Sequence, residues 1–160
     1  MNYQEEVNFL INHKKRNNFV KNLALSLNGN SLILFRIIEH GEYLYKIISE
    51  EVDEKRKVFL VHGKTDKETR EEVRRIVETQ SDAIIVASMG TFSTGINIRN
   101  LHNIIPVHPS KSRINILQSI GRTLRKAKGK NKATLYDLAD DFSRGKSRIN
   151  TTLQRKIENL

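Results

Sequence analysis

Two arginines set three residues apart, Arg122 and Arg125, are the side chains of this sequence best suited to act on a phosphoryl group. On a helix, residues three apart face the same way, so both guanidinium groups would point toward one ligand. Each guanidinium is permanently charged and offers a planar fork of donors that fits phosphate oxygens. Gly121, just before the pair, lets a ligand or a backbone come close. This arrangement predicts arginine fingers, which stabilise the charge that develops during phosphoryl transfer.

A nucleotide also needs a cradle for its phosphates, and the sequence shows none. A phosphate-binding loop would read G-x-x-x-x-G-K-[ST], and none of the eight glycines fits that pattern. The acidic pair Asp140-Asp141 follows an apolar strand, but it comes after the arginines and leads into a basic tail. The sequence therefore predicts half of an ATPase site, inactive alone, with ATP and Mg²⁺ bound mainly by an N-terminal lobe that this chain lacks.

The positive charge of the chain is concentrated in its last third. Residues 111–156 hold 13 Lys and Arg against 3 Asp and Glu, whereas residues 1–110 are nearly balanced. This asymmetry favours a polyanion as partner, with nucleic acid first among them. The alternative is a solvated basic face that only aids solubility. The short basic stretch 126–132 supplies three candidate contacts, Lys126, Lys128 and Lys130.

Composition excludes several other classes of protein. A length of 160 residues suits one domain with a real core. The absence of cysteine rules out disulfides and Cys-ligated zinc, and fits a reducing cytoplasm. No apolar run approaches the ~20 residues of a membrane span, and the N-terminus does not read as a signal peptide. Four histidines lack metal-ligand spacing, so we read them as structural or surface residues and predict no metal site in this chain: His13, His40, His102 and His108.

Strands and helices alternate along the chain and must position these residues. Most of the apolar runs are continuous, as in strands buried on both faces of a parallel sheet. The expected strands are Ser31–Arg36, Lys57–His62, Ala83–Ser88, Asn103–Val107 and Ala133–Leu138. The expected helices are Tyr3–Leu27 with a break near Arg16–Asn18, Glu39–Glu51, Asp66–Thr79 capped by Thr65, Ser112–Ala127, and a weaker basic one over Phe142–Leu160.

This alternation predicts an α/β fold, a doubly wound, mainly parallel sheet of about five or more strands flanked by helices. Right-handed crossovers bring the loops after the strands to one edge of the sheet, where ligands usually bind. We expect residues 1–160 to form a single domain with a basic helical tail over residues 142–160.

Gln118, Gly121, Arg122 and Arg125 together read Gln-x-x-Gly-Arg-x-x-Arg. This pattern resembles motif VI in the C-terminal RecA-like lobe of superfamily 2 helicases. The resemblance implies that both arginines reach ATP on the other lobe, and that Gln118 belongs to the nucleotide or interlobe network. A plain basic surface helix is the competing interpretation.

The stretch 87–98, Ala-Ser-Met-Gly-Thr-Phe-Ser-Thr-Gly-Ile-Asn-Ile, resembles motif V of the same family. It is read as a loop whose hydroxyls and open backbone N–H groups suit phosphate oxygens. The resemblance makes Ser88, Thr91 and Thr94 candidates for the nucleic-acid backbone, and places Gly95 and Asn97 toward the nucleotide. Relatives more often carry Asp where Asn97 stands. Asn97 differs from that Asp because its side chain brings no charge. An ordinary polar loop is the alternative.

Two further features carry less specific signals. The run Asn30–Phe35, followed by Glu39-His40-Gly41, resembles motif IV. His62-Gly63, with Arg70 seven residues after Gly63, matches another recurrent feature of this lobe, which places Gly63 and Lys64 near the nucleic-acid backbone. A strand-ending turn with Arg70 in a structural ion pair is an equally good interpretation.

The resemblance covers roughly residues 3–141, and the wording of both motifs most resembles phage helicases of the branched-DNA class. It implies an ATP-dependent motor that acts on branched DNA in recombination, repair and the processing of forks or R-loops, with RNA left open as substrate. Its partners would be DNA and the N-terminal lobe, with no membrane, in the host cytoplasm if the chain is phage-encoded. The rival hypothesis is a stand-alone nucleic-acid-binding or annealing module without motor activity.

Overall fold

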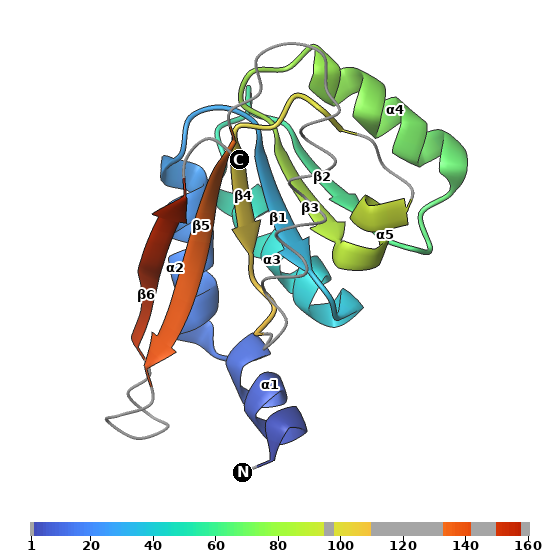
Figure 1. Cartoon of the computed structure of the whole chain (residues 1–160). Coiled ribbons are helices and arrows are strands. Elements are labelled where there is room, and N and C mark those ends of the chain that lie inside the picture. The colour runs from blue at the N-terminus through green and yellow to red at the C-terminus, as the bar shows by residue number, and fades with distance from the viewer. Residues whose placement is uncertain (1, 95–97, 110–132, 142–149, 158–160) are drawn as a thin grey trace.

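The computed structural model describes residues 2–94, 98–109, 133–141 and 150–157 (Figure 1). The described elements run in the order α1 (Tyr3–Ile11), α2 (Lys14–Ser26), β1 (Ser31–Phe35), α3 (Ile38–Glu51), β2 (Val58–Val61), α4 (Lys67–Glu78), β3 (Ile84–Ser88), α5 (Met89–Thr94), β4 (Asn103–Pro106), β5 (Thr134–Asp141) and β6 (Asn150–Ile157). No helix in this described part of the chain has the length and hydrophobicity that crossing a membrane requires.

The strands form one sheet in the order β2-β3-β1-β4-β5-β6. Neighbouring strands from β2 to β5 run parallel, and β6 pairs antiparallel with β5. The predicted fold is therefore confirmed: a mainly parallel sheet of at least five strands, flanked by helices. All five predicted strands are present, and β5 extends past its predicted end at Leu138 to Asp141.

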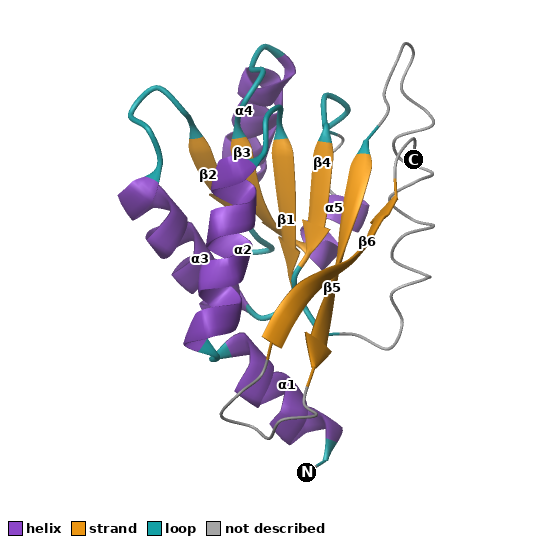
Figure 2. Ribbon diagram, turned by 90° about the vertical axis from the view of Figure 1, so that its left-hand side faces the viewer, coloured by secondary structure: helices purple, strands orange, loops and turns teal. Residues whose placement is uncertain are grey.

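Helices cover both faces of this sheet, with α2 and α3 on one face and α4 and α5 on the other (Figure 2). Successive residues of β1 point to opposite faces, as in any strand. Leu32 and Leu34 therefore join the core beneath α4 and α5, whereas Ile33 and Phe35 join the core beneath α2 and α3. The central strands β1 and β3 are buried from both sides, which explains why they read as continuous apolar runs.

The first helical region breaks earlier than predicted. The break lies at Asn12 and His13, between α1 and α2, and the expected break at Arg16–Asn18 is wrong. The His13 side chain caps α2 by accepting a hydrogen bond from the backbone N–H of Arg16, at 3.3 Å. Arg16 and Asn17 lie inside α2 and are buried. Their polar side chains make contacts in the interior and do not interrupt the helix.

Helix α4 is capped by Asp66, and the prediction of Thr65 as its cap is wrong. The Asp66 carboxylate accepts from the backbone N–H of Thr69 at 2.8 Å, the usual bond of an N-cap residue. The Thr65 hydroxyl instead accepts from the backbone N–H of His62 at 3.1 Å, which closes the turn after β2.

The predicted helix over Phe142–Leu160 is also wrong where the structure describes it. Residues Asn150–Ile157 form strand β6, which pairs with β5 from Leu135↔Ile157 to Asp141↔Asn150. The segment supplies β-branched residues at Thr151, Thr152 and Ile157. Without β6, β5 would be the edge strand of the sheet, with one side unpaired. Pairing with that edge outweighs the weak helical pattern, because strand formation depends strongly on tertiary context.

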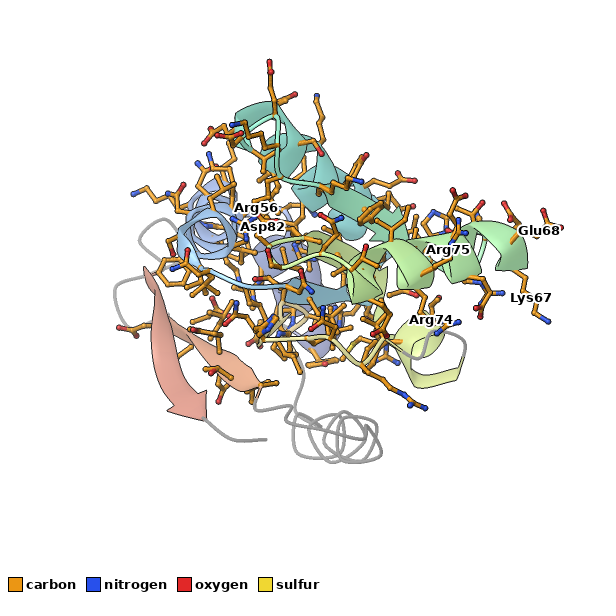
Figure 3. The ribbon with its side chains drawn as sticks, turned by 90° about the horizontal axis from the view of Figure 1, so that it is seen from above. Arg56, Lys67, Glu68, Arg74, Arg75 and Asp82 are labelled. Atoms are coloured by element: carbon orange, nitrogen blue, oxygen red, sulfur yellow. The ribbon has the colours of Figure 1, made fainter. Side chains whose placement is uncertain are left out.

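The edge of the sheet at the amino ends of the strands is closed by polar side chains. The Asn30 amide donates to the carbonyls of Gln80 and Asn100 and accepts from the N–H of Ala83, all at 2.8 to 2.9 Å. The Arg56 guanidinium donates to the carbonyl of Asp82, beside which it lies in Figure 3. These bonds satisfy loop backbone groups that would otherwise be costly to bury, and leave the opposite edge as the place for a site.

Candidate nucleotide and nucleic-acid interface

The carboxyl ends of the central strands meet at one edge of the sheet, at the bottom of Figure 1. Their register brings this about: Val61 of β2 pairs with Ala87 of β3, and Phe35 of β1 pairs with Ser88 of β3. Neighbouring strands lie about 4.8 Å apart. The structure therefore brings together the turn after β2, the start of α5 and the segment after β1, three regions that were singled out separately from the sequence.

Ser88 and Thr91 contact each other directly. The Ser88 hydroxyl donates to Thr91 Oγ1 at 2.6 Å and accepts from the backbone N–H of Thr91 at 3.3 Å. The second bond is of the kind that starts a helix, and residues Met89–Thr94 indeed form α5. The expectation of an open loop is wrong for these six residues. Thr91 is 4% exposed.

Thr94, the third hydroxyl of this set, is the last residue of α5. It lies two turns or fewer from Ser88 along a short helix, so the three predicted phosphate contacts belong to one compact segment at the edge of the sheet. Gly95 and Asn97, which follow, lie outside the described residues.

Gly63 and Lys64 form the exposed turn after β2. The backbone N–H of Lys64 donates to Nδ1 of His62 at 3.1 Å, and the N–H of Thr65 donates to the carbonyl of His62 at 2.9 Å. A Cβ atom built at Gly63 would meet nothing within 4 Å. Nothing in the described part of the chain therefore demands glycine here, which leaves the approach of an outside group as a reason for it.

Arg70 lies half-buried on α4, and its Nε atom is buried without a hydrogen-bond partner among the described residues. The ion pairs found in that part of the chain join other residues. The structure thus gives no support to the alternative of an Arg70 ion pair. A buried donor without a partner is unfavourable, so Arg70 Nε is a candidate for contact with a group outside the described residues.

Several predicted residues lie outside the part that the structure describes, together with the expected helix Ser112–Ala127. These residues are Gln118, Gly121, Arg122, Arg125, Lys126, Lys128 and Lys130. Their assignment rests on the sequence, and their place in the chain fixes only that they follow β4 and precede β5.

A buried polar cluster at the same edge was missed by the sequence analysis. It comprises Arg16 and Asn17 of α2, His40 of α3, His108 after β4 and Asp140 of β5. Arg16 Nε donates to Asp140 Oδ1 at 2.9 Å, and the Arg16 side chain is completely buried. His40 Nε2 lies 2.9 Å from Asn17 Oδ1. One signal could have revealed it: Arg16 stands four residues before Val20 and eight before Ala24, on the buried face of α2.

This cluster keeps its histidines neutral. The pKa of His40 is lowered to about 3, chiefly by burial and also by the neighbouring Arg16 and His108. Burial likewise lowers the pKa of His108 to about 4, helped by Arg36 and Arg16. Both histidines were predicted to be structural or surface residues, and the structure places both in the interior.

The residues present do not form a metal site in the part of the chain that the structure describes. No group of three or more His, Asp or Glu side chains in that part lies close enough to hold an ion. Asp140 and Asp141, the one acidic pair after an apolar strand, do not add to such a group, and Asp140 is already held by Arg16. The described residues therefore provide no set of ligands for Mg²⁺.

This chain is similar in sequence to known helicases. Residues 14–127 match the family described as helicase conserved C-terminal domain. The ATP-dependent DNA helicase uvsW of Enterobacteria phage T4 is 41% identical over 141 residues, which cover 86% of this chain and 28% of that protein. The chain thus spans little more than a quarter of the length of this curated relative.

Solved structures give the same relationship. The crystal structure of T4 UvsW matches with a TM-score of 0.76 and 40% identity, again over 86% of this chain and 28% of that one. Domain 2 of the DEAD-box helicase Mss116p, solved bound to an RNA duplex, matches with a TM-score of 0.52 and 18% identity over 77% of this chain and 47% of that one. The second match shows a shared fold, and the first agrees with the resemblance read from the two motifs.

Proposed function

This chain belongs to the helicase conserved C-terminal domain family, and from that premise we propose that it is the second motor lobe of an ATP-dependent DNA helicase or translocase. The observation that carries the proposal is the sequence Gln118-x-x-Gly-Arg-x-x-Arg125, which lies within the matched residues 14–127. The identity with an ATP-dependent DNA helicase of a phage supports the same reaction. Residues 1–160 are proposed to act as one lobe.

The two arginines act on the nucleotide in this proposal. ATP and its Mg²⁺ lie between this lobe and the N-terminal lobe, which holds most of the nucleotide. Arg122 and Arg125 stabilise the negative charge that develops on the γ-phosphoryl group, and sense its loss after hydrolysis. Gln118, Gly121, Gly95 and Asn97 line this lobe's side of the nucleotide.

The edge of the sheet holds the nucleic acid. Ser88, Thr91 and Thr94 are proposed to bind backbone phosphates of one strand, and Gly63 and Lys64 to approach it from the turn after β2. Support comes from the register, which sets this turn beside Ser88, and from the fully open space around Gly63. Hydroxyls and backbone N–H groups position a strand without reading its bases, as a motor that moves along DNA requires. Opening and closing of the cleft between the lobes would then shift this grip along the strand.

The preferred substrate in this proposal is branched DNA, met in recombination, repair, or fork and R-loop processing in the host cytoplasm of a phage. It rests on the similarity to the T4 helicase and on the motif wording, and RNA is the competing substrate.

A second candidate function is a stand-alone nucleic-acid-binding or annealing module. The concentration of charge in residues 111–156 favours it, since basic side chains such as Lys126, Lys128 and Lys130 would bind a strand without any nucleotide.

One experiment separates the two functions. The chain is joined to a nucleotide-binding helicase lobe, and both ATP turnover and salt-dependent binding to forked DNA are measured for two sets of variants. A motor lobe predicts that Arg122→Ala and Arg125→Ala each abolish turnover but leave binding nearly unchanged, whereas replacing the three lysines mainly weakens binding and lowers its salt dependence. A binding module predicts no turnover in any protein, with binding lost only in the lysine variant.

A further inference from the structure

A half-open pocket of about 560 Å³ lies between the α1–α2 corner and the first turns of α3. Its walls are lined by Asn8, Ile11, Asn12, Lys14, Asn17, Ile37, Glu39, His40 and Tyr43. We call it the α1–α3 pocket. Its volume falls in the range of pockets that bind small organic groups. Helix α1 precedes residues 14–127, which match the helicase family, so one wall of this pocket lies outside the matched range.

Side chains on α1 offer free amide groups to this pocket. Asn8 and Asn12 are four residues apart and thus on one side of the helix. The Asn12 amide nitrogen donates to the Asn8 carbonyl at 2.8 Å, and the Asn8 Oδ1 accepts from Gln4 at 3.3 Å. The remaining groups, the Asn8 amide nitrogen and Asn12 Oδ1, have no partner among the described residues. They supply one donor and one acceptor to the pocket wall, and a base edge carries groups of both kinds.

His40 lies in the same wall, and its ring is held in place by Asn17. The Asn17 amide nitrogen donates to the carbonyl of Ile11 at 2.9 Å, so its Oδ1 must accept the bond from His40 Nε2, at 2.9 Å. The proton of the neutral ring is therefore on Nε2, and Nδ1 carries a lone pair. Nδ1 is buried and has no partner in the described part of the chain, although the residue is only 3% exposed.

Tyr43 supplies an aromatic surface. It is 38% exposed, one of two large apolar side chains that the described residues leave open to solvent, and it lines the pocket. Tyr45, two residues further on, packs against the core instead. An aromatic ring at the wall of a polar pocket suits stacking with a planar heterocycle, because every base presents a π face.

The pocket lies at the same edge of the sheet as the proposed strand-binding residues. Helix α3 begins three residues after Phe35, which pairs in register with Ser88. The exposed Lys14 at the pocket wall adds a positive charge that suits a phosphate backbone. A nucleic-acid strand bound at Ser88 would therefore lie at the edge of the sheet that also carries the α1–α3 pocket.

We propose that the α1–α3 pocket receives an unstacked base of the bound nucleic-acid strand, which stacks on Tyr43 and hydrogen-bonds to Asn8 and Asn12. This inference rests on the proposed role in nucleic-acid binding and adds a base contact to a grip that is otherwise made of phosphate contacts. Binding of the base would not be sequence-specific, since stacking on the aromatic ring accounts for most of the affinity.

The test compares two single strands of equal length, oligothymidylate and its abasic analogue, which carry the same phosphates. Affinities of the full 160-residue chain for both are measured at one low salt concentration. We expect wild type to bind oligothymidylate about 5- to 100-fold more tightly. Tyr43→Phe keeps this preference because it keeps the ring, whereas Tyr43→Ala loses most of it. Asn8→Leu lowers the preference without removing the ring.

Ser49→Ala, an exposed change further along α3 and outside the pocket, serves as the matched control and leaves the preference unchanged. A preference that persists in Tyr43→Ala, or equal binding of both strands by wild type, would overturn the base pocket while leaving phosphate binding intact, and would assign the pocket to another class of ligand. Failure of wild type to bind either strand would instead contradict the proposed nucleic-acid role itself.

Discussion

At the scale of single residues, Arg16 has the environment least expected for its type. Its side chain is fully buried, it forms one ion pair with Asp140, and both of its terminal nitrogens are buried without a partner among the described residues. Burying a charge is unfavourable unless a counter-charge offsets the lost hydration. The single carboxylate therefore decides whether the corner between α1 and α2 is stable.

We expect Asp140→Asn to lower the free energy of unfolding by about 3 kcal/mol, since it leaves the Arg16 charge buried without its partner. The double variant Arg16→Met with Asp140→Asn removes both charges and should recover most of that loss. Urea denaturation of wild type and the two variants measures this. Equal loss in both variants would show that packing, and not the isolated charge, is responsible.

The neutral histidines of the same cluster predict a dependence of stability on pH. His40 has a folded pKa of about 3 and His108 of about 4, whereas an unfolded histidine titrates near 6.5. Above pH 6.5 these histidines are neutral in both the folded and the unfolded protein. Below pH 6.5 they bind protons in the unfolded protein but stay neutral in the folded protein. The contribution of the two neutral histidines to the free energy of unfolding is therefore fully present above pH 6.5. It falls as the pH drops toward 4, by at most about 1.4 kcal/mol per pH unit for each histidine.

Denaturation at pH 7, 6 and 5 tests this prediction. His40→Gln, which keeps a donor near Asn17 but cannot titrate, should show a shallower decline than wild type. A decline of equal steepness in the variant would remove His40 from the explanation.

The sequence predicts chemistry for two residues that lie outside the described part of the chain, and their role stays a prediction. The type and spacing of Arg122 and Arg125 predict their chemistry, because a phosphate-binding fork is a property of the side chain itself. The partners of Arg16 and His40 were not readable. They come from β5 and α2, 124 and 23 residues away, and only the folded chain brings them together.

At the scale of elements, Gly41 shows how closely α3 packs on the sheet. A Cβ atom at this position would lie 2.5 Å from ring atoms of Phe35, which is fully buried at the end of β1. The glycine lets α3, whose first turns line the α1–α3 pocket, lie close against β1.

Two opposing effects decide the outcome of Gly41→Ala. Alanine favours a helix over glycine by about 1 kcal/mol, but overpacking a core costs about 1 to 3 kcal/mol. Because the ring is enclosed and cannot move away, we expect a net loss of about 1 kcal/mol or more in the free energy of unfolding. Gly90→Ala in α5 is the control, since its Cβ meets nothing within 4 Å and stability should be kept or raised. A stabilised Gly41→Ala would contradict this packing.

The elements themselves were predicted unevenly, for a physical reason. The central strands β1 and β3 are buried on both faces, so each carries an apolar run that is visible in the sequence. Strand β6 has no such run, and its state is set by pairing with β5, a contact that no local pattern contains. Ser88 likewise starts a helix where the Gly- and Thr-rich sequence suggested a loop, because its hydroxyl caps the next turn.

At the scale of the whole molecule, the chain has two unlike edges. Asn30 and Arg56 tie the edge at the amino ends of the strands to its loops, whereas the opposite edge keeps open space at Gly63 and in the α1–α3 pocket. The position of this edge followed from the alternation of strands and helices, because crossovers of one hand bring all strand ends together. Which side chains meet there depended on the register between strands.

The central claim is that this lobe contributes arginines to an ATP site that it does not build alone. The most direct test is the rate of ATP hydrolysis by the 160-residue chain alone, and by the same chain joined to a nucleotide-binding helicase lobe, each with and without branched DNA. The account predicts no turnover by the chain alone, DNA-stimulated turnover by the joined protein, and a loss of at least about 10³-fold in Arg122→Ala or Arg125→Ala. Turnover by the chain alone that Arg125→Ala abolishes, or undiminished turnover in both joined variants, would contradict it.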